Sequence, residues 1–264
     1  MRLGLEIEGV YNEGIIDIEI GSYHSGTPIT FEWKAERDGS LRTSGDFEME
    51  STVEFVSGIF NGKKELTKGL QQLQRKLCTK DTKELNKLLY FNSSTGAHVH
   101  FSLNNDYNFQ NSCSYTCFEK ARKYFFKILK QSDIIPTATK ALIKNQYSRA
   151  YSRVNEGEAI RDLHTRYSEW NFCSERNGQG MEWRSFNLVG IKSWKELKEM
   201  YNLAYKTLKY LEKTLGKWSE TIEPIEDDMP IDKSGKRKKK KLKTRVVLDK
   251  KTEEIEECVT LISR

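Results

Sequence analysis

The sequence predicts an α+β fold in which antiparallel strands alternate with amphipathic helices. Four segments near the N-terminus alternate apolar and polar residues with the two-residue period of a strand, and they are residues 2–8, 15–20, 29–34 and 47–56. Short polar or glycine-containing turns separate them, which favours antiparallel pairing. The same alternation returns at residues 97–103 and 181–186.

Apolar residues recur at helical spacing between and after these strands. Leucines at this spacing predict one or two helices over residues 63–90, and the pattern at residues 118–129 and 139–146 predicts two more. The longest helix begins after Ser193, which forms a capping box with Glu196, and ends near Gly216.

Composition describes a folded, hydrophilic chain of 264 residues, with 37% hydrophobic and 31% charged residues. The sequence contains no apolar run of about 18 residues or more and no secretory signal at its N-terminus, so we expect a cytoplasmic protein without a membrane partner. The five cysteines are an odd number in a large domain, which predicts free thiols. Frequent lysine and asparagine are compatible with a bacterial or phage-encoded protein.

Charge is unevenly distributed along the chain. The formal net charge is +6, but residues 236–243 hold seven basic residues, and without them 37 basic residues face 38 acidic ones. We therefore expect a folded body over residues 1–218 and, over residues 219–264, an acidic linker with two prolines followed by a lysine-rich arm. Residues 235–243 could contact a nucleic acid or another polyanion, or could be a solvated arm.

Strand parity separates the side chains of the predicted strands into two faces, because successive residues point to opposite sides of a sheet. One face is apolar in four strands. The opposite face carries acidic residues, histidines, a serine and an arginine, namely Glu6, Glu8, Asp46, Glu48, Glu50, Glu54, His98, His100, Ser102, Glu182 and Arg184.

Two interpretations of this polar face are open. Each strand taken singly could expose its polar side chains to water, as half-buried antiparallel strands do. Exposed strands usually carry lysine, serine and threonine, however, whereas Glu and His dominate here, and like charges two residues apart repel unless a cation lies between them. Carboxylates with an imidazole are ligands for a divalent ion, so the four strands together predict a metal site.

Several short motifs resemble those of one enzyme superfamily. Residues 95–103, TGAHVHFSL, resemble the Gly-x-His-Val-His-x-Ser stretch of the glutamine synthetase and glutamate-cysteine ligase superfamily, and residues 4–8 are similar to its first Glu-x-Glu strand. Residues 38–41 and 54–57 resemble the Asp-Gly-Ser and Glu-Phe-Val-Ser pair of the amidoligase branch, and residues 182–184 resemble the late Glu-x-Arg. The motifs keep their order and span about seventy per cent of the chain.

The resemblance implies a funnel formed by a curved antiparallel sheet, with helices on its outer face, and a site that binds ATP with Mg²⁺ or Mn²⁺. The implied ion ligands are Glu6, Glu8, Glu54, His98 and Glu182. An acidic residue before Glu54 is also implied; spacing points near Asp46, whereas Glu48 and Glu50 share its face, and Glu48 is preferred by residue type. His100, Ser102 and Arg149 would contact nucleotide phosphate. Arg184, with Arg153 and Arg176, would stabilise the transferring phosphoryl group.

The activity implied by the resemblance is ATP-dependent carboxylate–amine ligation through an acyl phosphate. The carboxylate and amine would be small molecules, peptides or groups on a macromolecule. Ser93 stands where glutamine synthetases usually have a substrate-binding asparagine, and the separate N-terminal domain of those enzymes is missing, so glutamate and ammonia are not implied. Phosphoryl transfer alone, as in the related guanidino kinases, and polyanion binding are the alternatives.

Overall fold

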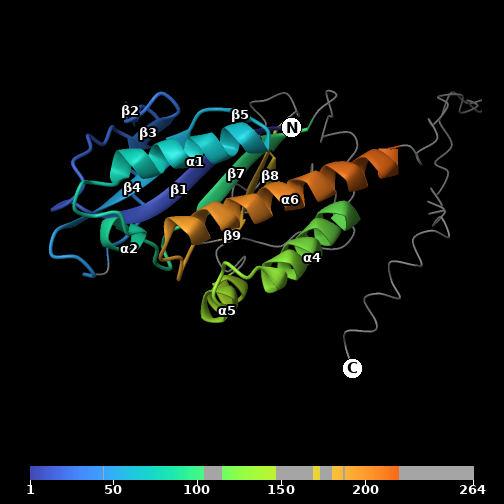
Figure 1. Cartoon of the computed structure of the whole chain (residues 1–264). Coiled ribbons are helices and arrows are strands. Elements are labelled where there is room, and N and C mark those ends of the chain that lie inside the picture. The colour runs from blue at the N-terminus through green and yellow to red at the C-terminus, as the bar shows by residue number, and fades with distance from the viewer. Residues whose placement is uncertain (44, 104–114, 147–168, 173–179, 187, 220–264) are drawn as a thin grey trace, which may run out of the picture. The chain divides into compact units, whose positions relative to one another are not determined.

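The computed structural model describes residues 1–43, 45–103, 115–146, 169–172, 180–186 and 188–219 (Figure 1). These residues belong to one compact unit, Met1–Thr221, and a second unit comprises Ile222–Arg264. From residue 220 onward the predicted linker and basic arm lie outside the described residues.

A nine-stranded sheet forms the centre of the described unit. Its strands are β1 (Arg2–Asn12), β2 (Thr27–Pro28), β3 (Trp33–Glu36), β4 (Glu50–Ser57), β5 (Phe60–Asn61), β6 (Leu89–Tyr90), β7 (Ala97–Ser102), β8 (Trp170–Phe172) and β9 (Met181–Phe186). The order across the sheet is β2-β3-β4-β1-β7-β9-β8, and β5 and β6 also pair with β1. Each of these pairings is antiparallel and the sheet is not closed, which confirms the predicted α+β class.

Five helices accompany the sheet in the described part of the chain. They are α1 (Lys63–Leu77), α2 (Leu85–Leu88), α4 (Tyr115–Gln131), α5 (Thr137–Gln146) and α6 (Trp194–Ser219). The capping box predicted for the longest helix is present, because the amide of Glu196 donates to Ser193 Oγ (3.2 Å) and the amide of Ser193 donates to Glu196 Oε2 (3.3 Å).

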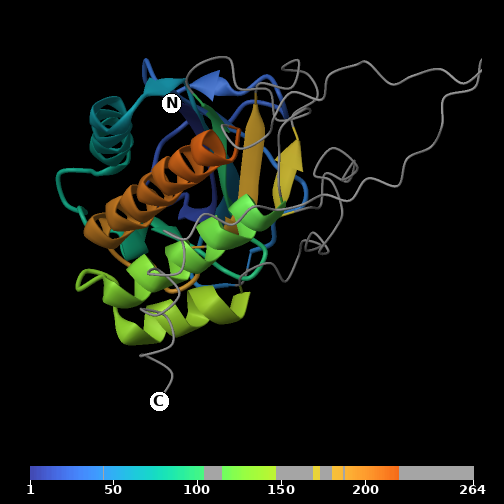
Figure 2. The same ribbon diagram turned by 90° about the vertical axis from the view of Figure 1, so that its right-hand side faces the viewer.

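Helices α1, α4 and α6 cover one face of the sheet, so the described unit has two layers (Figure 2). The core lies between these layers. Apolar strand residues at alternate positions, such as Leu5, Phe55, Val99 and Trp183, are buried there with the helix residues Leu70, Phe125 and Leu208. Strand parity assigned these strand residues to the apolar face, and their burial confirms that assignment.

A close contact fixes α1 on the sheet. The ring of Phe60 lies over Gly69, where an added Cβ would be 2.3 Å from Phe60 Cζ. Trp33 Nε1 of β3 donates a hydrogen bond to the Gly69 carbonyl (2.8 Å). A residue without a side chain therefore lets the helix approach the buried aromatic rings of the sheet.

Several predicted strand bounds were wrong. Residues 15–20 form no strand, and residues 29–32 form bends that precede β3. The strand predicted at residue 47 begins at Glu50, so the alternation at 47–49 is accidental, and Met49 is 56% exposed. The end of the predicted helical region 63–90 forms the short strand β6, and β8, only three residues long, was not predicted.

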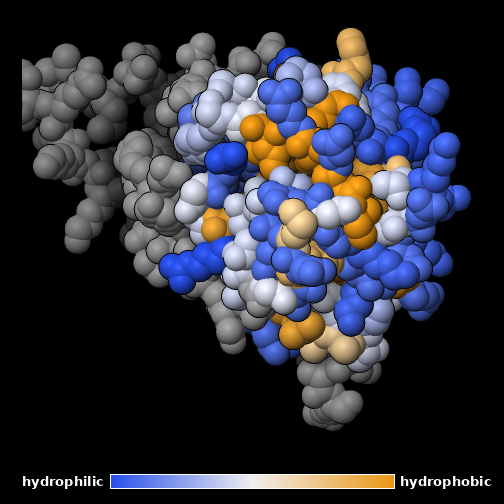
Figure 3. Space-filling view, turned by 90° about the vertical axis from the view of Figure 1, so that its left-hand side faces the viewer, coloured by the Kyte–Doolittle hydropathy of each residue, from blue (hydrophilic) through white to orange (hydrophobic). Residues whose placement is uncertain are grey.

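Figure 3 shows hydrophobic residues gathered in the upper middle of one face of the molecule, with hydrophilic residues around them. The large hydrophobic side chains with the greatest exposure among the described residues are Phe31 at 96% and Ile59 at 63%. Scattered exposed apolar residues are ordinary on a folded domain. No described helix combines the length and apolar character that crossing a membrane requires.

Candidate metal centre

The register of the sheet aligns three carboxylates in one row across adjacent strands. Glu36 of β3 lies opposite Glu54 of β4, and Glu54 lies opposite Glu8 of β1. All three are at most 6% exposed. They occupy the face of the sheet opposite the apolar one, because their neighbours Phe55 and Ile7 are core residues.

The same polar face continues across β1, β7, β9 and β8. Glu6 lies opposite His98, and in the next row His100 lies opposite Glu182, which in turn lies opposite Asn171. Residues that are far apart in sequence are thus brought together by antiparallel pairing alone.

Two histidines hold the carboxylate of Glu6. His98 Nδ1 lies 2.9 Å from Glu6 Oε2, and His100 Nε2 lies 2.8 Å from Glu6 Oε1. Burial alone would raise the pKa of Glu6, but the hydrogen bonds and charges of His100 and His98 outweigh it and hold the pKa well below its usual range. Glu6 is therefore ionised at neutral pH.

The imidazole of His98, 2% exposed, lies between two groups of carboxylates. Its Nδ1 faces Glu6 and also Glu182 Oε1 (3.4 Å), whereas its Nε2 faces Glu8 Oε1 (3.6 Å). A metal ion coordinates the neutral form of an imidazole. In that form of His98 the proton stays on Nδ1, because the ionised Glu6 only accepts hydrogen bonds, and the lone pair of Nε2 points toward Glu8.

Two sets of potential ligands share this ring. One comprises Glu8, Glu54 and His98 and the other comprises Glu6, His98 and Glu182, with the ligand atoms of each set within 4.8 Å of one another. Carboxylate oxygens with one imidazole fit a divalent cation. The orientation of the ring favours the first set for coordination through Nε2 and leaves Glu6 to orient the ring.

The row of carboxylates is electrostatically costly without a cation. Burial raises the pKa of Glu54 to about 9, and the negative charges of Glu6, Glu8, Asp38 and Glu36 add to the effect. Burial also raises the pKa of Glu8, against the opposing effects of His98 and of a hydrogen bond from the Gly96 amide. Glu54 therefore retains its proton at neutral pH in the absence of a cation.

Gly96 makes room for the first ligand set. A Cβ at this position would lie 3.0 Å from both Glu8 Oε2 and His98 Nε2, and the Gly96 amide itself donates to Glu8 Oε2. A glycine here allows the backbone to approach the two ligand atoms directly, which explains the Thr-Gly-Ala sequence before the histidines.

Glu182 is held by neighbours on both sides. Asn171 Nδ2 of β8 donates to Glu182 Oε2 (2.9 Å), and Arg184 Nε lies 3.4 Å from Glu182 Oε1. Asn171 thus fixes Oε2 of Glu182, and the other oxygen, Oε1, faces His98. His100 Nε2 lies 3.8 Å from the same Oε1.

The structure brings most of the predicted ligands together. Glu6, Glu8, Glu54, His98 and Glu182 belong to the two sets, and His100 and Arg184 border them. His100 contacts the carboxylate of Glu6, and Ser102 Oγ accepts a hydrogen bond from Arg2 Nε (3.2 Å); their predicted contacts with phosphate stay predictions. Arg149, Arg153 and Arg176 lie outside the described residues.

Glu48 requires a correction as the acidic residue that precedes Glu54. It lies before β4, is exposed and belongs to neither ligand set. The buried carboxylate next to Glu54 is instead Glu36, which forms an ion pair with Lys34 (3.1 Å). Sequence analysis missed Glu36 because it placed the strand at 29–34, before this residue.

Comparisons of the chain with protein-family models, curated proteins and solved structures gave no match. The geometry described above is thus the evidence on which a functional proposal rests.

The pKa of Glu54 predicts how the stability of the metal-free protein depends on pH. Between the ordinary pKa of 4.5 and the folded value of about 9, the folded chain keeps a proton that the unfolded chain has lost, so stability falls as pH rises, by up to roughly 1.4 kcal/mol per pH unit. Chemical denaturation in EDTA at pH 6, 7 and 8 measures this slope.

Glu54→Gln should reduce the slope, since glutamine does not titrate, and Glu8 should account for part of what remains. Glu48→Gln is the matched control, because Glu48 is exposed and lies outside both ligand sets. Equal slopes for the wild-type and Glu54→Gln proteins would contradict a neutral, buried Glu54.

Gly96→Ala should weaken Mn²⁺ binding at least roughly tenfold, because its Cβ would displace Glu8 or His98. Titration followed by electron paramagnetic resonance measures the free ion. Gly4→Ala is the control, since its Cβ would be 3.6 Å from His100 Cβ, an ordinary contact on the same sheet. Similar affinities in the two variants would exclude the first ligand set as the ion site.

Asn171→Ala should weaken Mn²⁺ binding by up to roughly tenfold, and by less than Gly96→Ala, because Asn171 holds Glu182, which contacts His98 Nδ1 but lies outside the favoured ligand set. Asn171→Asp should weaken binding too, despite its similar shape, because a carboxylate cannot donate to Glu182 and adds repulsion. An Asp variant that binds as well as wild type would show that Asn171 only fills space.

Proposed function

We propose that this chain is an ATP-dependent carboxylate–amine ligase whose divalent ions are bound on the polar face of the sheet. The observation that carries the proposal is the convergence of Glu8, Glu54 and His98, next to Glu6 and Glu182, on four adjacent strands. The motifs at residues 4–8, 54–57, 95–103 and 182–184, which resemble those of the ligase superfamily, each contribute at least one residue to the ligand sets.

The residues present fit Mg²⁺ or Mn²⁺. Carboxylate oxygens predominate, as hard cations such as Mg²⁺ and Mn²⁺ require, and the two ligand sets share one imidazole. A protonated Glu54 and a buried row of carboxylates indicate a place where a cation would replace a proton. The ion would neutralise charge on the phosphates of the nucleotide as the phosphoryl group is transferred.

Arg184 is a cation at the border of the ligand sets that can act on phosphate. Its ion pair with Glu182 orients the guanidinium at the border of the site, and the planar fork of arginine donates two parallel hydrogen bonds to phosphoryl oxygens. The side chain is only 16% exposed, so these bonds would form away from bulk water. Arg153, Arg176 and Arg149 are further candidates on the resemblance alone.

The reaction proposed has two steps. A substrate carboxylate oxygen attacks the terminal phosphorus of ATP, the bond from that phosphorus to the bridging oxygen breaks, and an acyl phosphate and ADP form. An amine then attacks the acyl carbon, the carbon–oxygen bond to phosphate breaks, and an amide, inorganic phosphate and a proton result. Arg184 would stabilise the charge of the transferring group in the first step.

A nucleotide titration tests the proposal before the substrates are known. A non-hydrolysable ATP analogue should bind in the presence of Mg²⁺ and lose at least roughly tenfold in affinity without it, as measured by isothermal titration calorimetry. The double variant Glu6→Gln, Glu8→Gln should lose this magnesium-dependent binding, whereas Glu48→Gln should retain it. Absence of magnesium-dependent binding to the wild-type protein would refute the proposal.

Mass spectrometry then separates ligation from phosphoryl transfer alone. Incubation with ATP, Mg²⁺ and pools of carboxylates and amines should yield ADP, phosphate and an amide. Release of ADP with a stable phosphorylated product and no amide would favour the guanidino-kinase-like alternative, which uses the same residues.

A further inference from the structure

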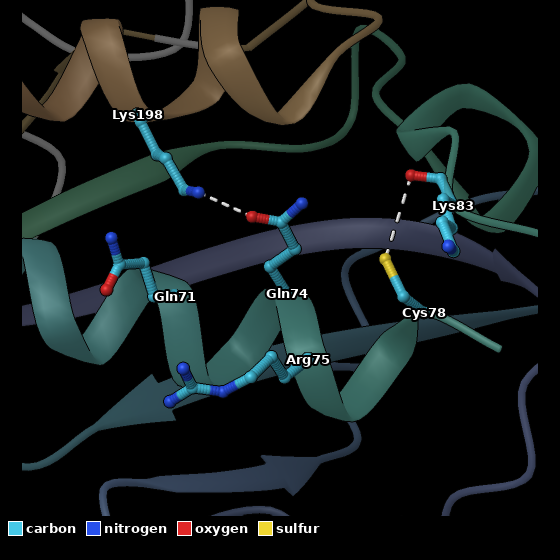
Figure 4. A pocket seen from close by; sticks show the side chains of 6 residues that line it. All are labelled: Gln71, Gln74, Arg75, Cys78, Lys83 and Lys198. Carbon is cyan, nitrogen blue, oxygen red and sulfur yellow. Dashed lines mark hydrogen bonds between the residues drawn. The ribbon is translucent and has the colours of Figure 1, made fainter. Parts of the chain in front are cut away.

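A second polar site lies in the helix layer, away from the carboxylates. A pocket of about 350 Å³ lies between α1, the segment that follows it and α6, and its lining residues are Gln71, Gln74, Arg75, Cys78, Lys83 and Lys198 (Figure 4). Since α1 and α6 cover the apolar face of the sheet, this pocket and the candidate metal centre occupy opposite sides of it.

The lining of this pocket is unusual in charge. Three side chains are cations, two are amides and one is a thiol, and no carboxylate contributes. Arg75, Lys83 and Lys198 form no ion pair with a carboxylate of the described residues. The pocket therefore groups three cations that no carboxylate of the described residues offsets through an ion pair.

The surroundings of Lys198 in the pocket contain a neutral hydrogen-bond acceptor and a second cation. Its ammonium group donates to Gln74 Oε1, a neutral acceptor, and Figure 4 shows the two side chains pointing toward one another. Burial lowers the pKa of Lys198; Cys78 opposes this effect and the charge of Arg75 adds to it. Because Gln74 accepts through its oxygen, its amide NH₂ remains a donor for a ligand.

Cys78 adds no negative charge to the pocket. Its thiol donates to the Lys83 carbonyl (3.6 Å), and burial raises its pKa, so the sulfur is neutral at physiological pH. An anion entering the pocket would meet ammonium, guanidinium and amide donors without a repelling group among the lining residues.

We propose that this pocket binds a small molecule through a phosphate group. Phosphate suits a lining of ammonium, guanidinium and amide groups better than a single carboxylate does, since it presents more acceptor oxygens and a larger charge. The volume is at the lower end of the range for small-molecule sites, which fits a compact phosphate ester. The inference uses none of the residues of the proposed ligase site.

Calorimetric titration in EDTA tests this pocket separately from the candidate metal centre. Without a divalent ion, the carboxylates of that centre would repel any phosphate group. Inorganic phosphate, pyrophosphate and ribose 5-phosphate are the probes. We expect Lys198→Gln to weaken binding of at least one probe by roughly tenfold or more and Lys198→Arg to retain most of it. Circular dichroism of each variant checks that the helix is intact.

Lys206→Gln is the matched control, since Lys206 is exposed on the same helix, outside the pocket, and its substitution changes the net charge equally. An equal loss in Lys206→Gln and Lys198→Gln, or no binding of any probe to the wild-type protein, would overturn the proposal. Lys198-dependent binding of a single-stranded oligonucleotide without binding of the small probes would also overturn it in favour of a nucleic-acid contact. Preference for ribose 5-phosphate over inorganic phosphate would identify an ester as the ligand.

Discussion

Repulsion among buried carboxylates is the constraint on which the candidate metal centre depends. Glu36, Glu54 and Glu8 lie directly opposite one another in adjacent strands, where like charges destabilise a sheet. The ammonium group of Lys34 compensates the charge of Glu36, whereas a bound proton keeps Glu54 uncharged. The packed helices on the other face hold the strands in register, so the carboxylates cannot separate, and a divalent cation is the simplest group to replace the proton.

The orientation of the His98 ring distinguishes the two ligand sets. Glu6 accepts from one nitrogen of the ring and thereby leaves the other facing Glu8, while His100 holds the second oxygen of Glu6. A neutral imidazole coordinates through one nitrogen at a time, so the two ligand sets are unequal. The set containing Glu8 and Glu54 is preorganised, and the set containing Glu6 and Glu182 needs rearrangement of the hydrogen bond to bind an ion through the same ring.

Strand parity made much of this site predictable. Once residues such as Leu5, Phe55 and Val99 are assigned to the core, their neighbours in sequence must point to the opposite face. Antiparallel pairing then brings the polar residues of adjacent strands together. Glu36 could not be found in this way, because the preceding bends hide the start of a four-residue strand. Asn171 lies in a three-residue strand that is too short for periodicity to detect, and its role follows only from its contact with Glu182.

Helix α6 lines the basic pocket and also packs on the sheet that carries the candidate metal centre. Lys198 lines the basic pocket, and Tyr201, three residues later and thus on a neighbouring position of the same helix face, is buried beneath the sheet. Burial raises the pKa of Tyr201 well above its usual value, and the charges of Glu8 and Glu6 contribute to the shift. The two carboxylates on the polar face thus add to an effect that burial dominates, on a phenol that belongs to the helix layer.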